Sequence, residues 1–184
     1  MEPIFLVAGG PGVGKSTTAR ALAATFERSV HIDVDEFRHM VRQGLALPGI
    51  GDWPDEVARQ VRLARETAVE MAERYAAAGF TVVLDDFWDP LDLAEYRDLI
   101  QKRETHRFLL YPSQDEARRR NRGRSPGADG DLIDQALPWI YGIYAPRVDA
   151  MREAGWQVLE TTGLEVERVV EEIRRRTAPR GSGA

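Results

Sequence analysis

The stretch that decides the fold is Gly9-Gly10-Pro11-Gly12-Val13-Gly14-Lys15-Ser16, which matches the pattern G-x-x-x-x-G-K-[ST] at every position. The apolar run Ile4–Ala8, just before it, is typical of a buried strand. Residues 15–28, which follow it, place apolar side chains at helical spacing. A strand, a glycine-rich loop and a helix in this order predict a loop that binds phosphate groups.

The residue types in this loop suit that chemistry. Glycines allow successive backbone N–H groups to turn inward and approach phosphates that side chains would block. Lys15 supplies a mobile positive charge for the β- and γ-phosphates, and the Ser16 hydroxyl is a ligand for Mg²⁺. A glycine-rich turn that binds nothing is the alternative, but it would not require the full pattern with both flanks. We therefore expect ATP and Mg²⁺ to be bound by Gly10, Gly12, Val13, Gly14, Lys15, Ser16 and Thr17.

The composition excludes several classes of protein. Of the 184 residues, 25 are Lys or Arg and 30 are Asp or Glu, so the formal net charge is −5. A general nucleic-acid-binding protein would be strongly basic, and we expect no nucleic-acid partner. The chain has no cysteine, which rules out disulfides, thiolate nucleophiles and cysteine-ligated zinc. Its histidines, His31, His39 and His106, lack the spacing of a metal site.

The N-terminal apolar run is too short for a signal peptide or a membrane span. We expect a cytoplasmic chain with no membrane partner. The length predicts a single domain over residues 1–177, and the Gly- and Pro-containing residues 178–184 predict a flexible tail.

Short apolar runs alternate with longer amphipathic segments along the whole chain, which indicates an α/β fold with a parallel sheet covered by helices. Strands are predicted over residues 4–8, 30–34, 80–84, 106–111 and 156–160. Helices are predicted over residues 15–28, 36–42, 55–78, 91–102, 113–124, 131–154 (with possible breaks near Pro138 and Pro146) and 166–176.

Carboxylates follow two of the predicted strands. Asp33 and Asp35 are expected to project to the same side where the strand at 30–34 ends, and Asp85 and Asp86 follow the strand at 80–84. Ligands of open α/β sheets bind outside the carboxyl ends of the strands, so these side chains lie at the correct edge. Phosphorylation of an alcohol needs a carboxylate that orients the hydroxyl and takes its proton.

Two observations narrow the class of phosphate-binding protein. The chain lacks the Asn/Thr-Lys-x-Asp motif that reads the base in GTPases, and it is short for a motor or AAA-type ATPase. It resembles the small P-loop kinases of the zeta-toxin and chloramphenicol-phosphotransferase group over roughly residues 3–175, with gluconate, shikimate and adenylylsulfate kinases further off. The resemblance rests on residues 9–17, 31–38, 85–86 and 118–124. It implies a three-layer fold with a five-stranded parallel sheet, and a lid at about residues 118–135.

The resemblance also implies roles for the carboxylates. In such kinases the acid before the short second helix, often in an Asp-x-Phe setting, acts as the base. Asp35, in Asp35-Glu36-Phe37, is therefore the first candidate and Asp33 the second, although Asp35 could simply cap the helix. Asp85 is preferred over Asp86 near the metal, and the alternative for Asp86 is a solvated turn.

Five arginines fall within residues 118–124: Arg118, Arg119, Arg120, Arg122 and Arg124. Phosphoryl transfer uses arginines that stabilise the charge on the transferred group. The resembling kinases show Arg-Asn-x-x-Arg here, which selects Arg120 and Arg124 as catalytic and Arg120 as a nucleotide contact. A solvated basic helix end is the alternative for two or three of the five.

The sequence does not name the phosphate acceptor. Candidate contacts to it are Asp33, Arg38, Trp53, Asp86 and Trp88. The leading hypothesis is a kinase acting on a hydroxyl of an antibiotic, sugar, nucleoside or nucleotide-sugar. The alternatives are a nucleoside-monophosphate kinase, which would use Arg38, Arg42 and Arg59, and a nucleotide-dependent regulatory or toxin-module protein. We expect a monomer or weak homodimer.

Overall fold

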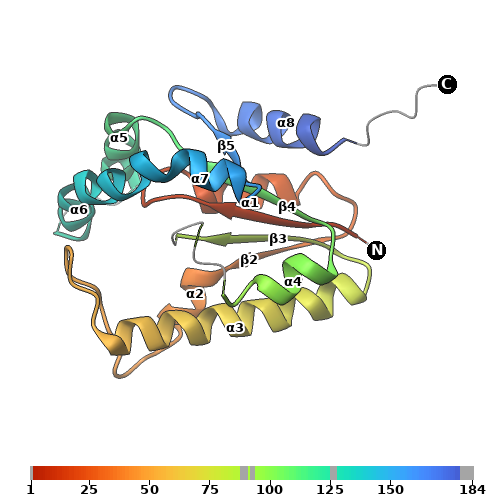
Figure 1. Ribbon diagram of the computed structural model, residues 1–184, viewed down its shortest axis with the longest axis horizontal. Helices are drawn as coiled ribbons and strands as arrows, with labels where there is room; N and C mark the ends of the chain where they lie inside the picture. Colours follow the sequence, from red (N-terminus) through yellow and green to blue (C-terminus); the bar gives the residue numbers. More distant parts are fainter. Residues whose placement is uncertain (1, 88–90, 92–93, 125–127, 179–184) are drawn as a thin grey trace.

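The computed structural model describes residues 2–87, 91, 94–124 and 128–178. Its centre is one sheet of five parallel strands in the order β2-β3-β1-β4-β5 (Figure 1). The strands are β1 (Ile4–Ala8), β2 (Ser29–Asp33), β3 (Thr81–Asp86), β4 (Thr105–Leu110) and β5 (Gln157–Leu159). This confirms the predicted five-stranded α/β fold.

Helices cover both faces of the sheet, and Figure 1 shows α3 on one side and α8 on the other. The helices are α1 (Lys15–Ala23), α2 (Val34–His39), α3 (Asp55–Ala77), α4 (Arg97–Lys102), α5 (Gln114–Arg124), α6 (Ala128–Tyr144), α7 (Val148–Glu153) and α8 (Val166–Thr177), with a 3₁₀ turn, η1, at Ala145–Arg147. No helix in the described part of the chain combines the length and apolarity needed to cross a membrane.

Alternation along β1 explains the three layers. Ile4 and Leu6 pack with α3 and α4 on one face, whereas Phe5 and Val7 pack with α1 and α8 on the other. Both faces of the central strand are therefore buried, as expected for a parallel sheet between helices. Because every side chain of β1 is apolar and buried, polar groups of a site can lie only beyond the ends of this strand.

The strand register brings the acidic ends of β2 and β3 beside the glycine-rich loop. Asp85 pairs with Val7 on one side and with Asp33 on the other, and Asp86 pairs with Ala8. Strand β3 continues two residues past the predicted strand, which ended at residue 84. Because Asp85 and Asp86 both lie within the strand, they point to opposite faces of the sheet.

Helix α2 differs from its prediction, with consequences for the site. It begins at Val34, two residues before the predicted start, because the Asp33 side chain accepts a hydrogen bond from the Asp35 N–H at 3.0 Å and caps the helix. The expectation that Asp33 and Asp35 both project from the end of a strand is therefore wrong. The alternative of Asp35 as the cap is also wrong, since Asp33 has that position.

Three other helix predictions were only partly correct. The helix predicted over 15–28 ends at Ala23. Within the described residues, the helix predicted over 91–102 is present as α4, from Arg97. The helix predicted over 131–154 divides at η1, next to Pro146, but Pro138 lies within α6. Proline therefore ends the helix at one of the two positions and is accommodated at the other. The predicted tail, apart from Ala178, lies outside the described residues.

Candidate active site

The glycine-rich loop is packed tightly against α5. Gly12 has a φ of +73°, and a Cβ at this position would lie 2.5 Å from the backbone oxygen of Ala117. No other residue fits that space or that backbone conformation without strain. Beside it, the Lys15 Nζ donates to the backbone oxygen of Gly10 at 3.0 Å, so the amine already lies over the loop.

Asp85 joins the loop to the sheet. Its Oδ1 accepts a hydrogen bond from the Ser16 hydroxyl at 3.0 Å, and its Oδ2 lies 2.6 Å from the His31 Nε2. His31, Asp33 and Asp85 each offer a ligand atom, and these atoms lie within 4.8 Å of one another. Hydroxyl and carboxylate oxygens are the donors that Mg²⁺ prefers, so the oxygens of Ser16, Asp33 and Asp85 fit the metal that the loop implies.

Asp86 faces the other way and is buried in a second polar cluster. Its Oδ2 accepts from the Arg65 Nε at 2.7 Å and from the Tyr96 hydroxyl at 2.8 Å. Burial, followed by the negative charge of Asp86, raises the pKa of Tyr96 well above its ordinary value. The alternative of a solvated turn is wrong for Asp86, because this residue is only 7% exposed.

Asp35 lies next to a buried arginine and an aromatic pair. The Arg38 Nη1 donates to the Asp35 Oδ1 at 3.2 Å, and its Nη2 donates to the backbone oxygen of Ala46 at 3.2 Å. The Arg38 guanidinium lies 5.6 Å from the ring centre of Phe87, which is 6.4 Å from the ring of Trp53. The structure thus groups Asp35, Arg38 and Trp53, all of which the sequence had selected. Trp88 lies outside the described residues.

Gln60 of α3 holds the loop on which Arg38 rests. Its side-chain oxygen accepts from the Ala46 N–H at 3.0 Å, and its amide nitrogen donates to the backbone oxygen of Gly44 at 2.8 Å. The same nitrogen donates to Glu56 at 2.7 Å. A buried glutamine therefore fixes the backbone of residues 44–46, and through Ala46 it fixes Arg38.

One cleft of about 530 Å³ connects these groups. The glycine-rich loop and the side chains of Asp33, Asp35 and Arg38 all line it. Asp85, Asp86 and Phe87 lie at its base, at the carboxyl end of β3. Phosphate-binding groups and a candidate base thus face the same space, which is the geometry that transfer between two bound molecules needs.

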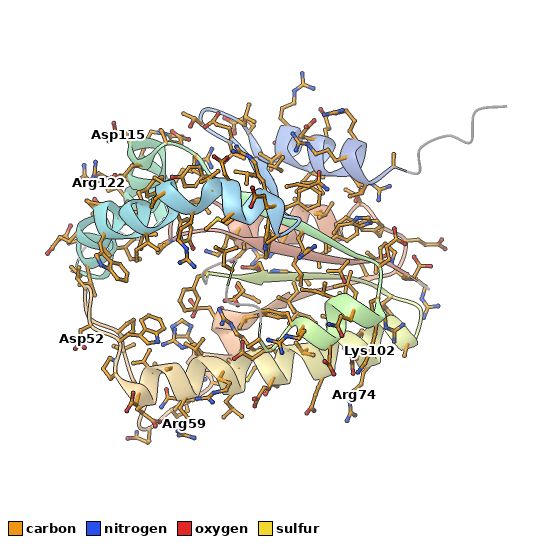
Figure 2. All side chains as sticks on the ribbon, viewed as in Figure 1. Asp52, Arg59, Arg74, Lys102, Asp115 and Arg122 are labelled. Carbon is orange, nitrogen blue, oxygen red and sulfur yellow. The ribbon has the colours of Figure 1, made fainter. Side chains whose placement is uncertain are left out.

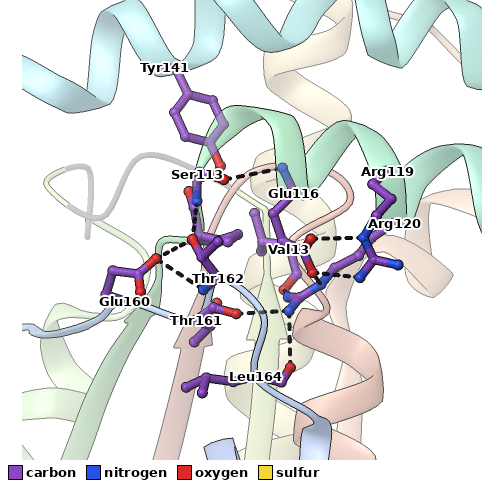
Figure 3. A network of polar contacts seen from close by, with 11 residues as sticks. Val13, Ser113, Glu116, Arg119, Arg120, Tyr141, Glu160, Thr161, Thr162 and Leu164 are labelled. Atoms are coloured by element: carbon purple, nitrogen blue, oxygen red, sulfur yellow. Dashed lines mark hydrogen bonds and ion pairs between the residues drawn. The ribbon is translucent and has the colours of Figure 1, made fainter.

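Arg120 of α5 lies beside Val13 of the glycine-rich loop (Figure 3). Its guanidinium donates to the backbone oxygens of Val13 at 3.0 Å, Thr161 at 2.8 Å and Leu164 at 3.1 Å. A second cleft of about 450 Å³, which Gly14, Thr17 and Gly163 also line, opens there. Arg120 does not line the cleft that contains Asp35. Its Nε, Nη1 and Nη2 all donate within the protein, and its predicted contact with the nucleotide stays a prediction.

The basic helix end is neutralised by the protein's own carboxylates. Arg118 pairs with Asp115 at 3.0 Å, Arg119 and Arg120 pair with Glu116 at 2.7 and 2.8 Å, and Arg122 pairs with Asp134 at 2.6 Å. The hydrogen bond from Arg119, together with the charge of Arg120, lowers the pKa of Glu116 to about 2. The side chain of Arg124 lies outside the described residues.

Sequence reasoning missed several residues that shape the site. His31 lies two positions before Asp33 on the same strand, so alternation could have placed it on the same face. Arg65 interrupts the apolar stripe of α3 yet is buried, which marks it as a paired charge. Asn121 is fully buried, and its amide donates to the Gly130 backbone oxygen at 2.9 Å and to Asp134 at 2.8 Å. It ties α5 to α6.

Comparisons with known proteins agree with this arrangement. A family model described as an AAA domain matches residues 4–140. Guanylate kinase from Geobacter metallireducens is 24% identical over 194 residues, covering 93% of this chain and 85% of that protein.

Two solved structures have similar folds. Shikimate kinase from Acinetobacter baumannii, in complex with shikimate, is 18% identical with a TM-score of 0.63, and the match covers 96% of this chain and 93% of that one. A tunicamycin resistance protein from Deinococcus radiodurans is also 18% identical with a TM-score of 0.63, covering 97% and 96%. At these identities the likeness shows a shared P-loop kinase fold.

Proposed function

We propose that this chain, which belongs to the AAA domain family whose model matches residues 4–140, is an ATP-dependent phosphotransferase acting on a hydroxyl of a small molecule. One observation carries the proposal. A single cleft is lined by Lys15, Ser16 and Asp85 on the phosphate side and by Asp35 on the other side. Phosphate-binding groups and a carboxylate base are the parts that transfer to an alcohol requires.

In the proposed mechanism, the loop amides and Lys15 hold the β- and γ-phosphates of ATP. Ser16 and Asp85 would hold Mg²⁺, which supplies charge neutralisation at those phosphates when it is bound. Asp35 orients the acceptor hydroxyl and takes its proton as the new O–P bond forms. The bond between the γ-phosphorus and the β–γ bridging oxygen breaks, and ADP leaves. Asp33, the helix cap, is the second candidate for the base.

The arginines of α5 complete the nucleotide side. We propose that Arg120 contacts ATP from the side of Thr161 and Leu164, and that Arg124 approaches the γ-phosphate when the segment around residues 118–135 closes. The hydrogen bond from Arg120 to the Val13 backbone oxygen attaches α5 to the loop, and the ion pair with Glu116 within α5 holds the Arg120 side chain. The catalytic unit that we propose spans residues 1–177 as one domain.

A nucleoside-monophosphate kinase is the second candidate, favoured by the 24% identity to guanylate kinase. Such an enzyme would bind the acceptor phosphate with arginines and would not need a base. Arg38, Arg42 and Arg59 were the sequence candidates for that task. In the structure, Arg38 pairs with Asp35, and Arg59 pairs with Glu56. Arg42 is exposed and does not line the cleft. We therefore place the alcohol kinase first.

The test is ADP release from Mg·ATP against a panel of sugars, nucleosides, nucleotides, nucleotide-sugars and aminocyclitol or phenicol antibiotics, with Lys15→Ala as the blank. We expect at least one acceptor to raise turnover well above background and to yield a phosphorylated product by mass spectrometry. Tight ATP binding with no stimulation by any small acceptor, but stimulation by a protein partner, would instead support a regulatory or toxin-module protein.

A further inference from the structure

We infer that the acceptor carries no phosphate or carboxylate at the end that enters the cleft, and that it is an uncharged or amine-bearing hydroxyl compound. This rests on the proposed function, since it names the substrate class of the same site. Among the described residues that line the cleft, five are carboxylates and two are permanent cations, Lys15 and Arg38. The carboxylates are Asp33, Asp35, Glu36, Asp85 and Asp86.

Neither cation is available to an anionic acceptor. Lys15 lies over the glycine-rich loop, where it serves the phosphates of ATP. Arg38 is only 7% exposed, and its guanidinium is held by Asp35, by the Ala46 carbonyl and by the face of Phe87. The Arg38 Nε is buried without a hydrogen-bond partner, but the charge of the guanidinium is balanced by Asp35.

The neighbouring arginines of α3 are also committed to carboxylates. Arg59 donates from Nε and Nη2 to both oxygens of Glu56, at 2.7 and 2.8 Å, and lies on the outer side of α3 (Figure 2). Arg65 is buried against Asp86 at 2.7 Å, with Glu95 at 3.6 Å. Arg59 and Arg65 thus each have an acidic partner, and Arg38 is the one arginine among the described residues that line the cleft. A bidentate clamp for a phosphate or carboxylate would need such arginines unpaired.

Electrostatics then selects the acceptor. Asp35 is paired with Arg38 and Asp86 with Arg65, which leaves Asp33, Glu36 and Asp85 against Lys15 before Mg·ATP adds its own negative charge. Like charges brought together at a binding site penalise an anionic partner strongly. An uncharged hydroxyl meets no such penalty, and an ammonium group would be attracted. Phe87 lines the cleft and offers an apolar face against which a ring could lie, and the ring of Trp53 lies 6.4 Å from that of Phe87.

The experiment compares matched acceptors that differ only in charge. The pairs are each nucleoside against its 5′-monophosphate, glucose and glucosamine against gluconate, and inositol and an aminocyclitol against inositol phosphate. For the best acceptor scaffold, we expect kcat/KM of the uncharged or amine-bearing member to exceed that of the anionic member at least about tenfold at low salt. The ratio should shrink in 0.5 M KCl (~4 Å screening length). Turnover that prefers the phosphate or carboxylate member would overturn the inference and leave the kinase proposal standing.

A charge variant tests the cause. Glu36 is exposed, lines the cleft and lies outside the proposed catalytic groups, so Glu36→Lys should narrow the discrimination several-fold. Glu70→Lys, an equally exposed helical glutamate away from the cleft, should leave it unchanged. Equal effects of the two variants would contradict the inference.

If no acceptor is turned over, the kinase proposal fails. The inference is then tested by measuring the binding affinity of each acceptor pair in the presence of Mg²⁺ and a non-hydrolysable ATP analogue. Tighter binding of the anionic member, or equal binding of both members, would refute the inference.

Discussion

The two sides of the cleft are built differently. The nucleotide side is mostly backbone and close in sequence: residues 9–16 form the loop, and Gly12 leaves no space for a side chain against Ala117. The acceptor side is mostly side chains that meet across long separations, such as Arg65 with Asp86 and Gln60 with Ala46. A backbone cradle can be recognised in a sequence motif. A network of paired side chains leaves no such motif.

The largest expected effect separates the two sides. Asp35→Asn keeps the size of the side chain and an oxygen that can accept from Arg38, but it removes the base. We expect acceptor-dependent turnover to fall by about 10²–10⁴-fold with ATP affinity unchanged, because the nucleotide side does not depend on Asp35. Turnover and nucleotide binding would be measured together, with the exposed Asp98→Asn as the matched control. A variant that loses ATP binding as well would show that the two sides are not separable.

The second effect is on stability, and it lies on the acceptor side. Arg65→Met leaves the buried Asp86 carboxylate without its ion-pair partner. We expect the free energy of unfolding to fall by about 3–5 kcal/mol, a decrease of about 6–20 °C in Tm. Adding Asp86→Leu should recover part of this loss, as measured by denaturant unfolding. An Arg65→Met protein as stable as the wild type would mean that the pair contributes nothing to the acceptor side.

The third effect concerns His31, which lies where the two sides meet. Its Nε2 contacts the Asp85 Oδ2, whereas the Ser16 hydroxyl donates to the Asp85 Oδ1. We expect His31→Leu to raise the Mg²⁺ concentration for half-maximal turnover about 10–100-fold, because residues behind a metal ligand orient it. His31→Gln, which can still donate a hydrogen bond, should restore most of the loss. The readout is a Mg²⁺ titration of turnover, alongside Tm. If both variants lower Tm equally and leave the titration unchanged, His31 has only a structural role.

The smallest expected effect concerns the nucleotide side and depends on pH. The pKa of Glu116 is lowered from 4.5 to about 2, so its ionised form stabilises the fold above pH 4.5, and this contribution is lost as the pH falls towards 2. Glu116→Gln should therefore reduce the free energy of unfolding by about 1 kcal/mol at pH 6 and by less at pH 3. Urea unfolding at the two pH values measures the difference. A loss that is the same at both values would assign the effect to packing and not to charge.

Much of the fold could be predicted from the sequence. The five strands and the long helix α3 follow from apolar periodicity, which depends on neighbouring residues alone. The errors occurred where one side chain decides a boundary. Asp33 caps α2 and moves its start to Val34, and neither propensity nor periodicity specifies which of two nearby aspartates takes that position.

The candidate site divides in the same way. Adjacent strand residues face opposite sides, so the sequence predicts different surroundings for Asp85 and Asp86. In the structure Asp85 contacts Ser16, and Asp86 contacts Arg65. The partners Arg65, Gln60 and His31 could not be assigned, since their role depends on which distant segment packs against them. The position of Arg120 also required the structure, because its three backbone acceptors come from two distant loops.

The strand order has a consequence for the timing of synthesis. Strand β1 pairs with β3 and β4, as in Ile4 with Val82 and with Thr105, so nothing in the first third of the chain can complete its sheet. The backbone oxygens that hold Arg120 arrive only with Thr161 and Leu164. At ordinary translation speeds, of about 5–20 residues per second, the ribosome exposes the glycine-rich loop roughly 7–30 s before that last support exists. A nascent chain thus carries the complete phosphate motif well before the backbone acceptors that hold Arg120 beside it have been made.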